Sequence, residues 1–266
     1  GEVAEGLGVE IYPGFSAAEV LFNTDNSVKG VATGDMGVSR EGGAKDSWEA
    51  GMELHAKFTL FSEGTRGSLS KFLIDNFNLS DGKDFQKYAI GLKEVWEIQE
   101  ENFSEGLVEH SMGWPLSDGT NGGSFLYHFD HNLVSIGYVI HLNYTNPYAS
   151  PFDEFQQFKT HPSVKKILKG GKRLSYGARA ITTGGYQSVP KLNFPGGALI
   201  GCSAGFLNYP KIKGTHNAME SGMLAAEAII EKKISQDESN DLENYQLGYE
   251  KSRIFKELKK VRNVKP

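Results

Sequence analysis

The residues with the clearest chemical potential form one run of small and polar side chains, GCSAGFLNYPKIKGTHNAM, at 201–219. The run joins a strand predicted at 198–200 to a helix predicted to begin near Gly214. The first N–H groups of a helix have no partners and carry partial positive charge, so a phosphate or a ring gaining negative charge is stabilised at 214–218. The run does not spell G-x-G-x-x-G, and its glycines alone favour an ordinary buried strand-to-helix turn.

The helix behind this run predicts its own packing. Met223, Ala226, Ile229 and Ile230 fall on one stripe with the small Ala225 and Ala228 beside them, and we expect this face to pack against a sheet. Other candidate chemistry is weaker. The histidines lack metal-ligand spacing and a carboxylate ligand, so we expect no metal site. The single Cys202 excludes an intrachain disulfide framework and indicates a small packing residue.

The elements that position this run begin with strands predicted at 9–12, 15–21 and 28–33. Residues 34–51 are polar and glycine-rich, which predicts a hairpin or loop. A strand at 54–61 then leads through EGTRG into a helix, which spacing alone predicts to be capped by Thr65 or Ser68.

The middle of the chain carries strand signals at 88–96, 106–112, 124–129 and 133–141, joined by Gly, Asn and Asp turns, and predicts an antiparallel sheet. Residues 118–123 are all turn formers, so composition favours a turn at Gly122 and Gly123. An amphipathic helix is predicted from Pro151 to about residue 168, a strand at 175–181, and an irregular segment at 182–190.

Composition indicates an α/β (α+β) protein with a sizeable core, because 39% of its 266 residues are hydrophobic. The net charge of −5 does not favour nucleic acid. No window approaches the ~20 apolar residues of a membrane-spanning helix, so we expect any membrane contact to be peripheral.

Nearly the whole chain, roughly residues 6–231, resembles the electron transfer flavoprotein–ubiquinone oxidoreductase family. The resemblance is carried, in the family's order, by these blocks: GVEIYPGFSAAEVLF, SVKGVATGDMGV, GMELHAKFTLFSEGTRGSLSK, GWPLSDGTNGGSFLYHF, NPYASPFDEFQQFKTHPSVK, GGKRLSYGARAITTGGYQSVPKLNFPGGALIGC and KIKGTHNAMESGMLAAEAI. A shorter motif such as EGTRG would indicate only the wider class that includes geranylgeranyl reductases and aromatic hydroxylases.

The resemblance implies an FAD-dependent oxidoreductase fold of the geranylgeranyl-reductase-like class, with an antiparallel sheet that binds quinone. It implies FAD contacts at Glu63, Gly64, Gly67, Thr182, Gly201, Gly205, Gly214, Thr215, His216 and Asn217. It implies ubiquinone contacts at Gly122 and Gly123, and no catalytic side chain, because the flavin performs the redox chemistry. Two positions depart from the family: Asn121 stands where an aromatic residue is usual, and Thr182 where Asn is frequent.

The implied organisation has four parts: residues 1–84 and 173–235 in an FAD-binding domain, 85–172 in the quinone-binding sheet domain, and 236–266 in a C-terminal helix. We expect the chain to be an internal fragment of a protein whose other parts hold a G-x-G-x-x-G motif and a four-iron, four-sulfur (4Fe-4S) cluster, and to be inactive when isolated.

The implied activity is transfer of electrons from reduced electron transfer flavoprotein to ubiquinone. The implied location is the matrix face of the mitochondrial inner membrane in a eukaryote, or the cytoplasmic membrane face in a bacterium. Two alternatives stay open: a geranylgeranyl-reductase-like flavoenzyme acting on an isoprenoid lipid, and a non-catalytic module that binds lipid or a partner.

Overall fold

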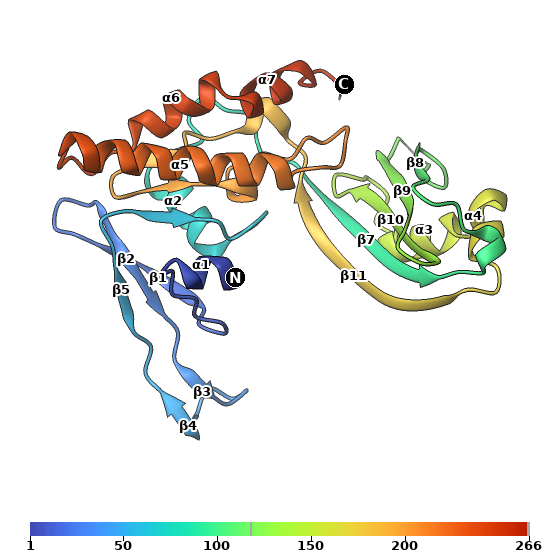
Figure 1. Cartoon of the computed structure of the whole chain (residues 1–266), viewed down its shortest axis with the longest axis horizontal. Helices are drawn as coiled ribbons and strands as arrows, with labels where there is room; N and C mark the ends of the chain where they lie inside the picture. Colours follow the sequence, from blue (N-terminus) through green and yellow to red (C-terminus); the bar gives the residue numbers. More distant parts are fainter. Residues whose placement is uncertain (118, 265–266) are drawn as a thin grey trace. The chain divides into compact units, whose positions relative to one another are not determined.

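The computed structural model describes residues 1–117 and 119–264, and these divide into two compact units. Unit 1 comprises Gly1–Asp81, Pro190–Ala204 and His216–Lys256. Unit 2 comprises Gly82–Val189, Gly205–Thr215 and Glu257–Pro266. Each unit is assembled from segments far apart in the sequence, and each is described separately below (Figure 1).

Unit 1 combines small sheets with helices. Its strands are β1 (Ala17–Phe22), β2 (Val28–Thr33), β3 (Met36–Val38), β4 (Ala44–Glu49), β5 (Glu53–His55), β6 (Thr59–Phe61), β12 (Asn193–Phe194) and β13 (Gly197–Leu199). Its helices are α1 (Glu2–Gly6), α2 (Ser68–Asn76), α5 (Thr215–Ser235, whose first residue is counted with unit 2), α6 (Glu243–Lys251) and the start of α7 (Arg253–Lys260).

The strands of unit 1 pair in three groups. One antiparallel sheet has the order β1-β2-β5, and β3 pairs with β4 as a separate hairpin. In the third sheet, β13 pairs in parallel with β6 and antiparallel with β12. The buried phenol of Tyr245 on α6 donates to the Leu199 carbonyl at 3.0 Å, which fixes α6 on this sheet.

Unit 2 is built on a five-stranded antiparallel sheet of order β11-β7-β10-β9-β8. Its elements are β7 (Tyr88–Glu97), β8 (Val108–Met112), β9 (Gly122–Phe129), β10 (Leu133–His141), β11 (Lys172–Thr182), α3 (Pro151–Phe158) and α4 (Pro162–Leu168), with 3-10 turns at Glu100–Asn102 and Gly185–Ser188. One face of the sheet is covered by α3 and α4, where Ile136, Tyr138, Phe155 and Phe158 form the core.

A buried carboxylate ties α3 to this face. Glu94 on β7 is 3% exposed and accepts hydrogen bonds from Lys159 at 2.8 Å and from the Trp96 indole at 2.8 Å, while Arg173 lies 3.2 Å away. Burial acts to raise the pKa of Glu94, but the bonds from Lys159 and Trp96 outweigh it, so the pKa lies below its ordinary value. Glu94 therefore remains ionised as a structural anchor.

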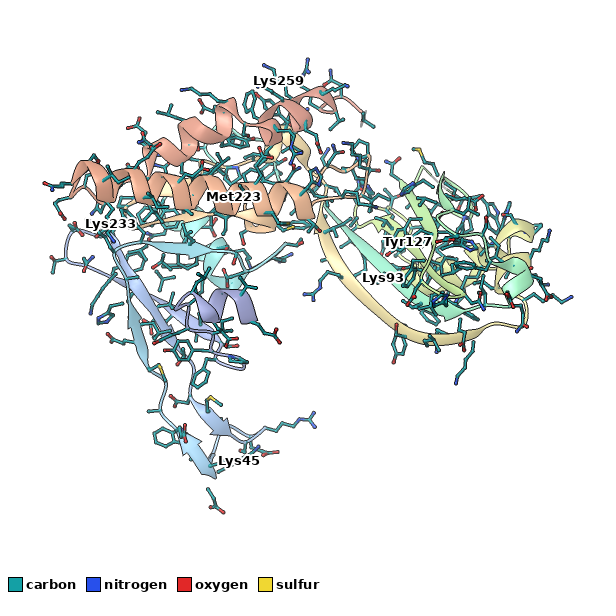
Figure 2. All side chains as sticks on the ribbon, in the orientation of Figure 1. Lys45, Lys93, Tyr127, Met223, Lys233 and Lys259 are labelled. Atoms are coloured by element: carbon teal, nitrogen blue, oxygen red, sulfur yellow. The ribbon has the colours of Figure 1, made fainter. Side chains whose placement is uncertain are left out.

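Several local predictions are wrong, each for a physical reason. Residues 9–12 pair with no strand, and 54–61 breaks into β5 and β6. The helix predicted through residue 168 is interrupted before Pro162, which begins α4. On α5 the prediction is only partly correct: Ala225 and Ala228 are buried as expected, but Met223 is 62% exposed (Figure 2). The buried face is completed by Asn217 and Ser221 instead.

Candidate functional site

The predicted site residues fall in both units, and within unit 1 three of their segments meet. Gly201 has φ +60° and donates its N–H to the buried Ser221 hydroxyl of α5 at 2.9 Å. A Cβ at Gly201 would lie 3.4 Å from the Cβ of Ala218, so the 201–203 turn lies against the first turns of α5, next to His216 and Asn217. The Ser203 hydroxyl donates to the Gly64 carbonyl at 3.3 Å, so the turn at Gly64 also lies beside the 201–203 turn.

Glu63 and Gly67 have a structural role in this unit. The Glu63 carboxylate accepts from the Ser70 N–H at 2.5 Å, the Ser70 hydroxyl at 2.6 Å and the Leu69 N–H at 3.3 Å, and so caps α2. The caps predicted at Thr65 and Ser68 are wrong. A Cβ on Gly67 would collide with Glu63, which explains why glycine precedes this helix. Cofactor contacts at Glu63 and Gly67 remain predictions.

In unit 2, Thr182 is the predicted flavin residue with the most direct structural support. It ends β11, is 3% exposed, and its hydroxyl oxygen has no hydrogen-bond partner among the described residues. A buried hydroxyl left without a partner costs ~1–3 kcal/mol, so its position suits a ligand that supplies the missing bond. This is the observation by which the chain fits a flavin.

Gly205 and Gly214, also in unit 2, lie in close contact with neighbouring side chains. A Cβ at Gly205, which has φ +81°, would lie 2.7 Å from the Gln86 amide nitrogen, and Gln86 accepts from the Gly184 N–H at 2.8 Å. A Cβ at Gly214 would lie 3.0 Å from Leu207. Gln86 therefore links the Gly205 turn to the segment just after Thr182. Gly214 is followed directly by Thr215, the first residue of α5.

The turn favoured by composition at Gly122 and Gly123 is wrong, because both residues belong to β9. Gly123 lies opposite Met112 on β8 and Val139 on β10. A Cβ on Gly123 would lie 2.5 Å from the Ser111 carbonyl oxygen, and one on Gly122 would collide with the Val139 carbonyl. The two glycines thus allow close pairing of β9 with its neighbours, and their contact with ubiquinone remains a prediction.

Beside this pair lies a largely apolar cavity of about 250 Å³. It is lined by His110, Ser111, Met112, Gly122, Gly123, Ser124, Val139, Tyr209, Pro210, Ile212 and Val264. Met112 and Val264 are well exposed, so the rim is apolar. The cavity can hold one small ring against the backbone of the glycine pair.

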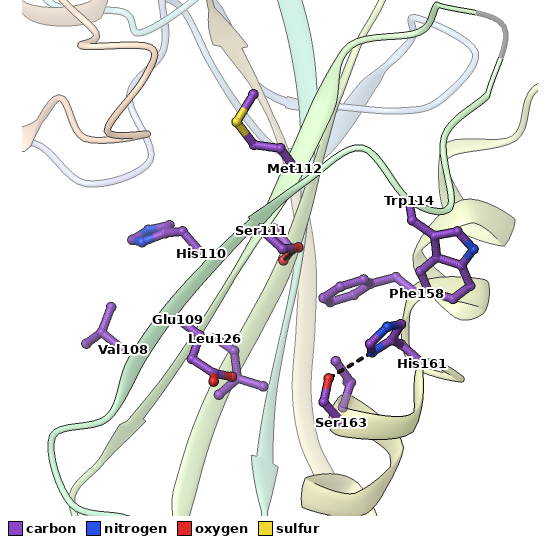
Figure 3. Close-up of a pocket in the computed structure, with 12 residues that line it drawn as sticks. Val108, Glu109, His110, Ser111, Met112, Trp114, Leu126, Phe158, His161 and Ser163 are labelled. Carbon is purple, nitrogen blue, oxygen red and sulfur yellow. Dashed lines mark hydrogen bonds between the residues drawn. The ribbon is translucent and has the colours of Figure 1, made fainter.

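A second pocket of about 540 Å³ lies between β8, β9 and the α3–α4 junction (Figure 3). Ser111 shares a 2.6 Å hydrogen bond with Ser124, and His161 one of 2.8 Å with Ser163. The ring of Trp114 packs on His161 at 5.2 Å. Polar and apolar side chains line this pocket in about equal measure, so it suits an apolar ring less well than the cavity beside the glycine pair.

Sequence reasoning missed the turn that supplies Tyr209, Pro210 and Ile212 to the apolar cavity. In the sequence, only the nearby Gly214 of KIKGTH indicated a functional segment. Cys202 is half-buried, and burial raises the pKa of its thiol, consistent with a packing residue. Within residues 1–117 and 119–264, no cluster of three or more His, Cys, Asp or Glu side chains could bind a metal ion, and no helix is long and apolar enough to cross a membrane.

Comparisons with known proteins give consistent results. A family model described as "ETF-QO, ubiquinone-binding" matches residues 88–181. The chain is 53% identical over 273 residues to the mitochondrial electron transfer flavoprotein-ubiquinone oxidoreductase of Homo sapiens, covering 100% of this chain and 44% of that protein. It is 54% identical over 262 residues to the enzyme of that name from Pseudomonas aeruginosa, covering 98% of this chain and 48% of the relative. The chain therefore spans less than half the length of these relatives.

Solved structures share the fold at low identity. A geranylgeranyl bacteriochlorophyll reductase-like protein from Thermoplasma acidophilum aligns with a TM-score of 0.69 and 18% identity, over 94% of this chain and 56% of that one. A variant of a flavin-dependent brominase aligns with a TM-score of 0.57 and 18% identity, over 98% of this chain and 58% of the brominase. The predicted fold class, mixed α/β with an antiparallel sheet and related to flavin-dependent oxidoreductases, is confirmed.

Proposed function

This chain belongs to the electron transfer flavoprotein–ubiquinone oxidoreductase family, and from that premise we propose that it forms the flavin- and quinone-binding core of an enzyme that passes electrons from reduced electron transfer flavoprotein to ubiquinone. The observation that carries the proposal is the apolar cavity beside Gly122 and Gly123, two residues inside the segment that matches the ubiquinone-binding family model.

The cavity suits a quinone head group by size and chemistry. Pockets for drug-sized ligands measure ~300–1,000 Å³, so about 250 Å³ holds one substituted ring and leaves a long tail outside. The rim at Met112 and Val264 gives that tail an apolar exit. Gly122 and Gly123 bring flat backbone to the ring, and Val139 packs from the neighbouring strand.

On the flavin side, FAD supplies the electron-transfer chemistry when it is bound. The Thr182 hydroxyl would donate the hydrogen bond that it lacks within the described residues to a flavin acceptor. Gly214, Thr215, His216 and Asn217 would present the N–H groups of the α5 start to negative charge. Gly64, Gly201 and Gly205 have positive φ and shape turns that let backbone approach a ligand.

Peripheral membrane contact follows from exposed apolar side chains on unit 2. Val108 and Met112 project from the same face of β8, with Trp114 just beyond the strand (Figure 3). Such a patch lets a protein of net charge −5 meet a bilayer without electrostatic attraction. We place the enzyme at the matrix face of the mitochondrial inner membrane in a eukaryote, or at the cytoplasmic membrane face in a bacterium. We also propose that the 4Fe-4S cluster expected for the full-length protein is held outside this chain.

The test is an anaerobic stopped-flow measurement on the FAD-loaded full-length protein that contains this chain. We expect flavin absorbance to bleach with reduced electron transfer flavoprotein and to recover with a short-chain ubiquinone. Recovery only with an isoprenoid alkene would support the geranylgeranyl-reductase-like alternative, which at present rests on fold similarity at 18% identity alone. No bleaching by the reduced donor, in a protein with full flavin content, would favour a non-catalytic module.

A further inference from the structure

The turn from Asn208 to Lys213 lines the apolar cavity and is held by several hydrogen bonds. Its ends pair as an antiparallel bridge, with the Asn208 N–H donating to the Lys213 carbonyl at 2.9 Å and the Lys213 N–H returning at 3.3 Å. Asn208 is fully buried, and its side-chain amide donates to Glu257 at 2.7 Å. The turn is therefore held in one conformation by contacts within unit 2.

Ile212 adopts a backbone conformation in this turn that its side chain disfavours. Its φ is +53°, a left-handed value that is rare for β-branched residues. The other non-glycine residues with positive φ in the described part of the chain are Asn26, Asn78, Asp130, Asn132 and Gln236, none of them β-branched. Glycine would relieve the strain at 212, so the isoleucine side chain must serve a purpose that opposes folding stability.

The location of the Ile212 side chain indicates a role in the apolar cavity. Ile212, Tyr209 and Pro210 all line the apolar cavity, as does the glycine pair. The Tyr209 ring is packed edge-on against the buried His141 ring, with centroids 4.7 Å apart, so it is fixed as well. Tyr209 and Pro210 also line a small hollow of about 30 Å³ beside Thr183–Gln187, so they form the wall between the two spaces.

We infer that the Asn208–Lys213 turn is the specificity wall of the quinone cavity: the Tyr209 ring and the strained Ile212 side chain set its width to a single-ring quinone and position that ring against Gly122 and Gly123. This inference rests on the proposed function. It assigns the strain at Ile212 to ligand binding rather than to folding, and it assigns the bulk of Tyr209, not its hydroxyl, to ring packing.

The test compares five variants of the FAD-loaded full-length protein, of which Gln236→Gly is a control for backbone strain. Ile212→Gly and Tyr209→Ala enlarge the cavity, Tyr209→Phe keeps the ring, and Tyr148→Ala removes a tyrosine that is 92% exposed and does not line the cavity. The readouts are KM for a short-chain ubiquinone and for a bicyclic naphthoquinone, the rate of reduction by electron transfer flavoprotein, the melting temperature, and the Kd of the same ubiquinone for the 266-residue chain by quenching of tryptophan fluorescence.

We expect Ile212→Gly to raise the melting temperature by about 2–6 °C because strain is relieved, and to raise KM and Kd for ubiquinone about tenfold. Tyr209→Ala should raise both constants by a similar factor and improve relative use of the naphthoquinone. Tyr209→Phe and Tyr148→Ala should match the wild type, and reduction by the protein donor should be unchanged throughout. Gln236→Gly, at a left-handed position in unit 1, should leave both quinone constants unchanged.

A stabilised Ile212→Gly protein with unaltered quinone constants would overturn the inference, as would a Tyr209→Phe variant as impaired as Tyr209→Ala. These results are distinguishable from failure of the proposed function. In that case the wild-type protein itself neither binds nor reduces ubiquinone, and the inference falls with it.

Discussion

Substitution of Gly123 by alanine tests whether the glycine pair is required by the sheet itself. A Cβ at this position would lie 2.5 Å from the Ser111 carbonyl oxygen, whereas ordinary contact begins at 3.4 Å. The strands β8 and β9 must therefore separate by roughly 0.9 Å, or the backbone must twist, to admit one methyl group. Overpacking of this kind costs ~1–3 kcal/mol, so Gly123→Ala should destabilise unit 2 by that amount.

Two glycines of the same sheet are matched controls. A Cβ at Gly177 would meet nothing within 4 Å, and one at Gly91 would make ordinary contacts at 3.7 Å. Gly177→Ala and Gly91→Ala should therefore change stability by no more than about 0.5 kcal/mol.

Thermal unfolding followed by circular dichroism measures the global effect, and hydrogen exchange of peptides covering 108–129 measures the local one. We expect faster exchange and a lower melting temperature for Gly123→Ala, at roughly 2–4 °C per kcal/mol. Equal behaviour of the three variants would refute the steric reasoning. The larger Gly123→Val substitution should impair both half-reactions of the enzyme by disrupting the strands, so it cannot separate a structural from a quinone-binding role.

Three further outcomes follow from the structure. Glu63→Ala should destabilise unit 1 by ~1 kcal/mol in urea unfolding because α2 loses its cap, while Ser68→Ala should be neutral; the reverse order would restore the cap predicted from sequence. Glu94→Gln should lower the free energy of unfolding of unit 2 at neutral pH. Because folding lowers the pKa of Glu94, the difference in unfolding free energy between variant and wild type should shrink as pH falls through that pKa. A difference that does not change with pH would contradict the ionic anchor. The protein should bind neutral phosphatidylcholine vesicles even at ~1 M salt, where charges are screened within ~3 Å, and Met112→Glu should weaken that binding; loss of wild-type binding on adding salt would exclude the apolar patch.

Much of unit 2 was predictable because alternation of apolar and polar residues is a local signal. The strands predicted at 88–96 and 133–141 agree with β7 and β10. Ser150 caps α3 through its hydroxyl and Pro151 follows at the first helical position, as sequence rules require. In β7, in β10 and at the start of α3, the local sequence preferences and the tertiary structure therefore favour the same conformation.

Other features were not predictable, since they depend on segments far apart in the chain. Gly122 and Gly123 have the composition of a turn, yet strand pairing of Gly123 with Met112 and Val139 places them in β9. Met223 lies on an apolar stripe of α5, but the opposite face, with Ser221 bonded to Gly201, is the one that unit 1 buries. The cavity wall at Tyr209 and Ile212 has no sequence signal, because a positive φ at isoleucine contradicts local preference.

Photoaffinity labelling with an azido-substituted ubiquinone tests the central claim, that the cavity beside the glycine pair binds the quinone ring, most directly. The FAD-loaded full-length protein would be irradiated and the labelled peptides identified by mass spectrometry, with excess unlabelled ubiquinone as competitor. We predict that competed labelling is confined to peptides that contain residues of the cavity lining, which are His110–Met112, Gly122–Ser124, Val139, Tyr209, Pro210, Ile212 and Val264. Competed labelling at other peptides only, such as those of the pocket formed by Phe158, His161 and Ser163, would contradict the account.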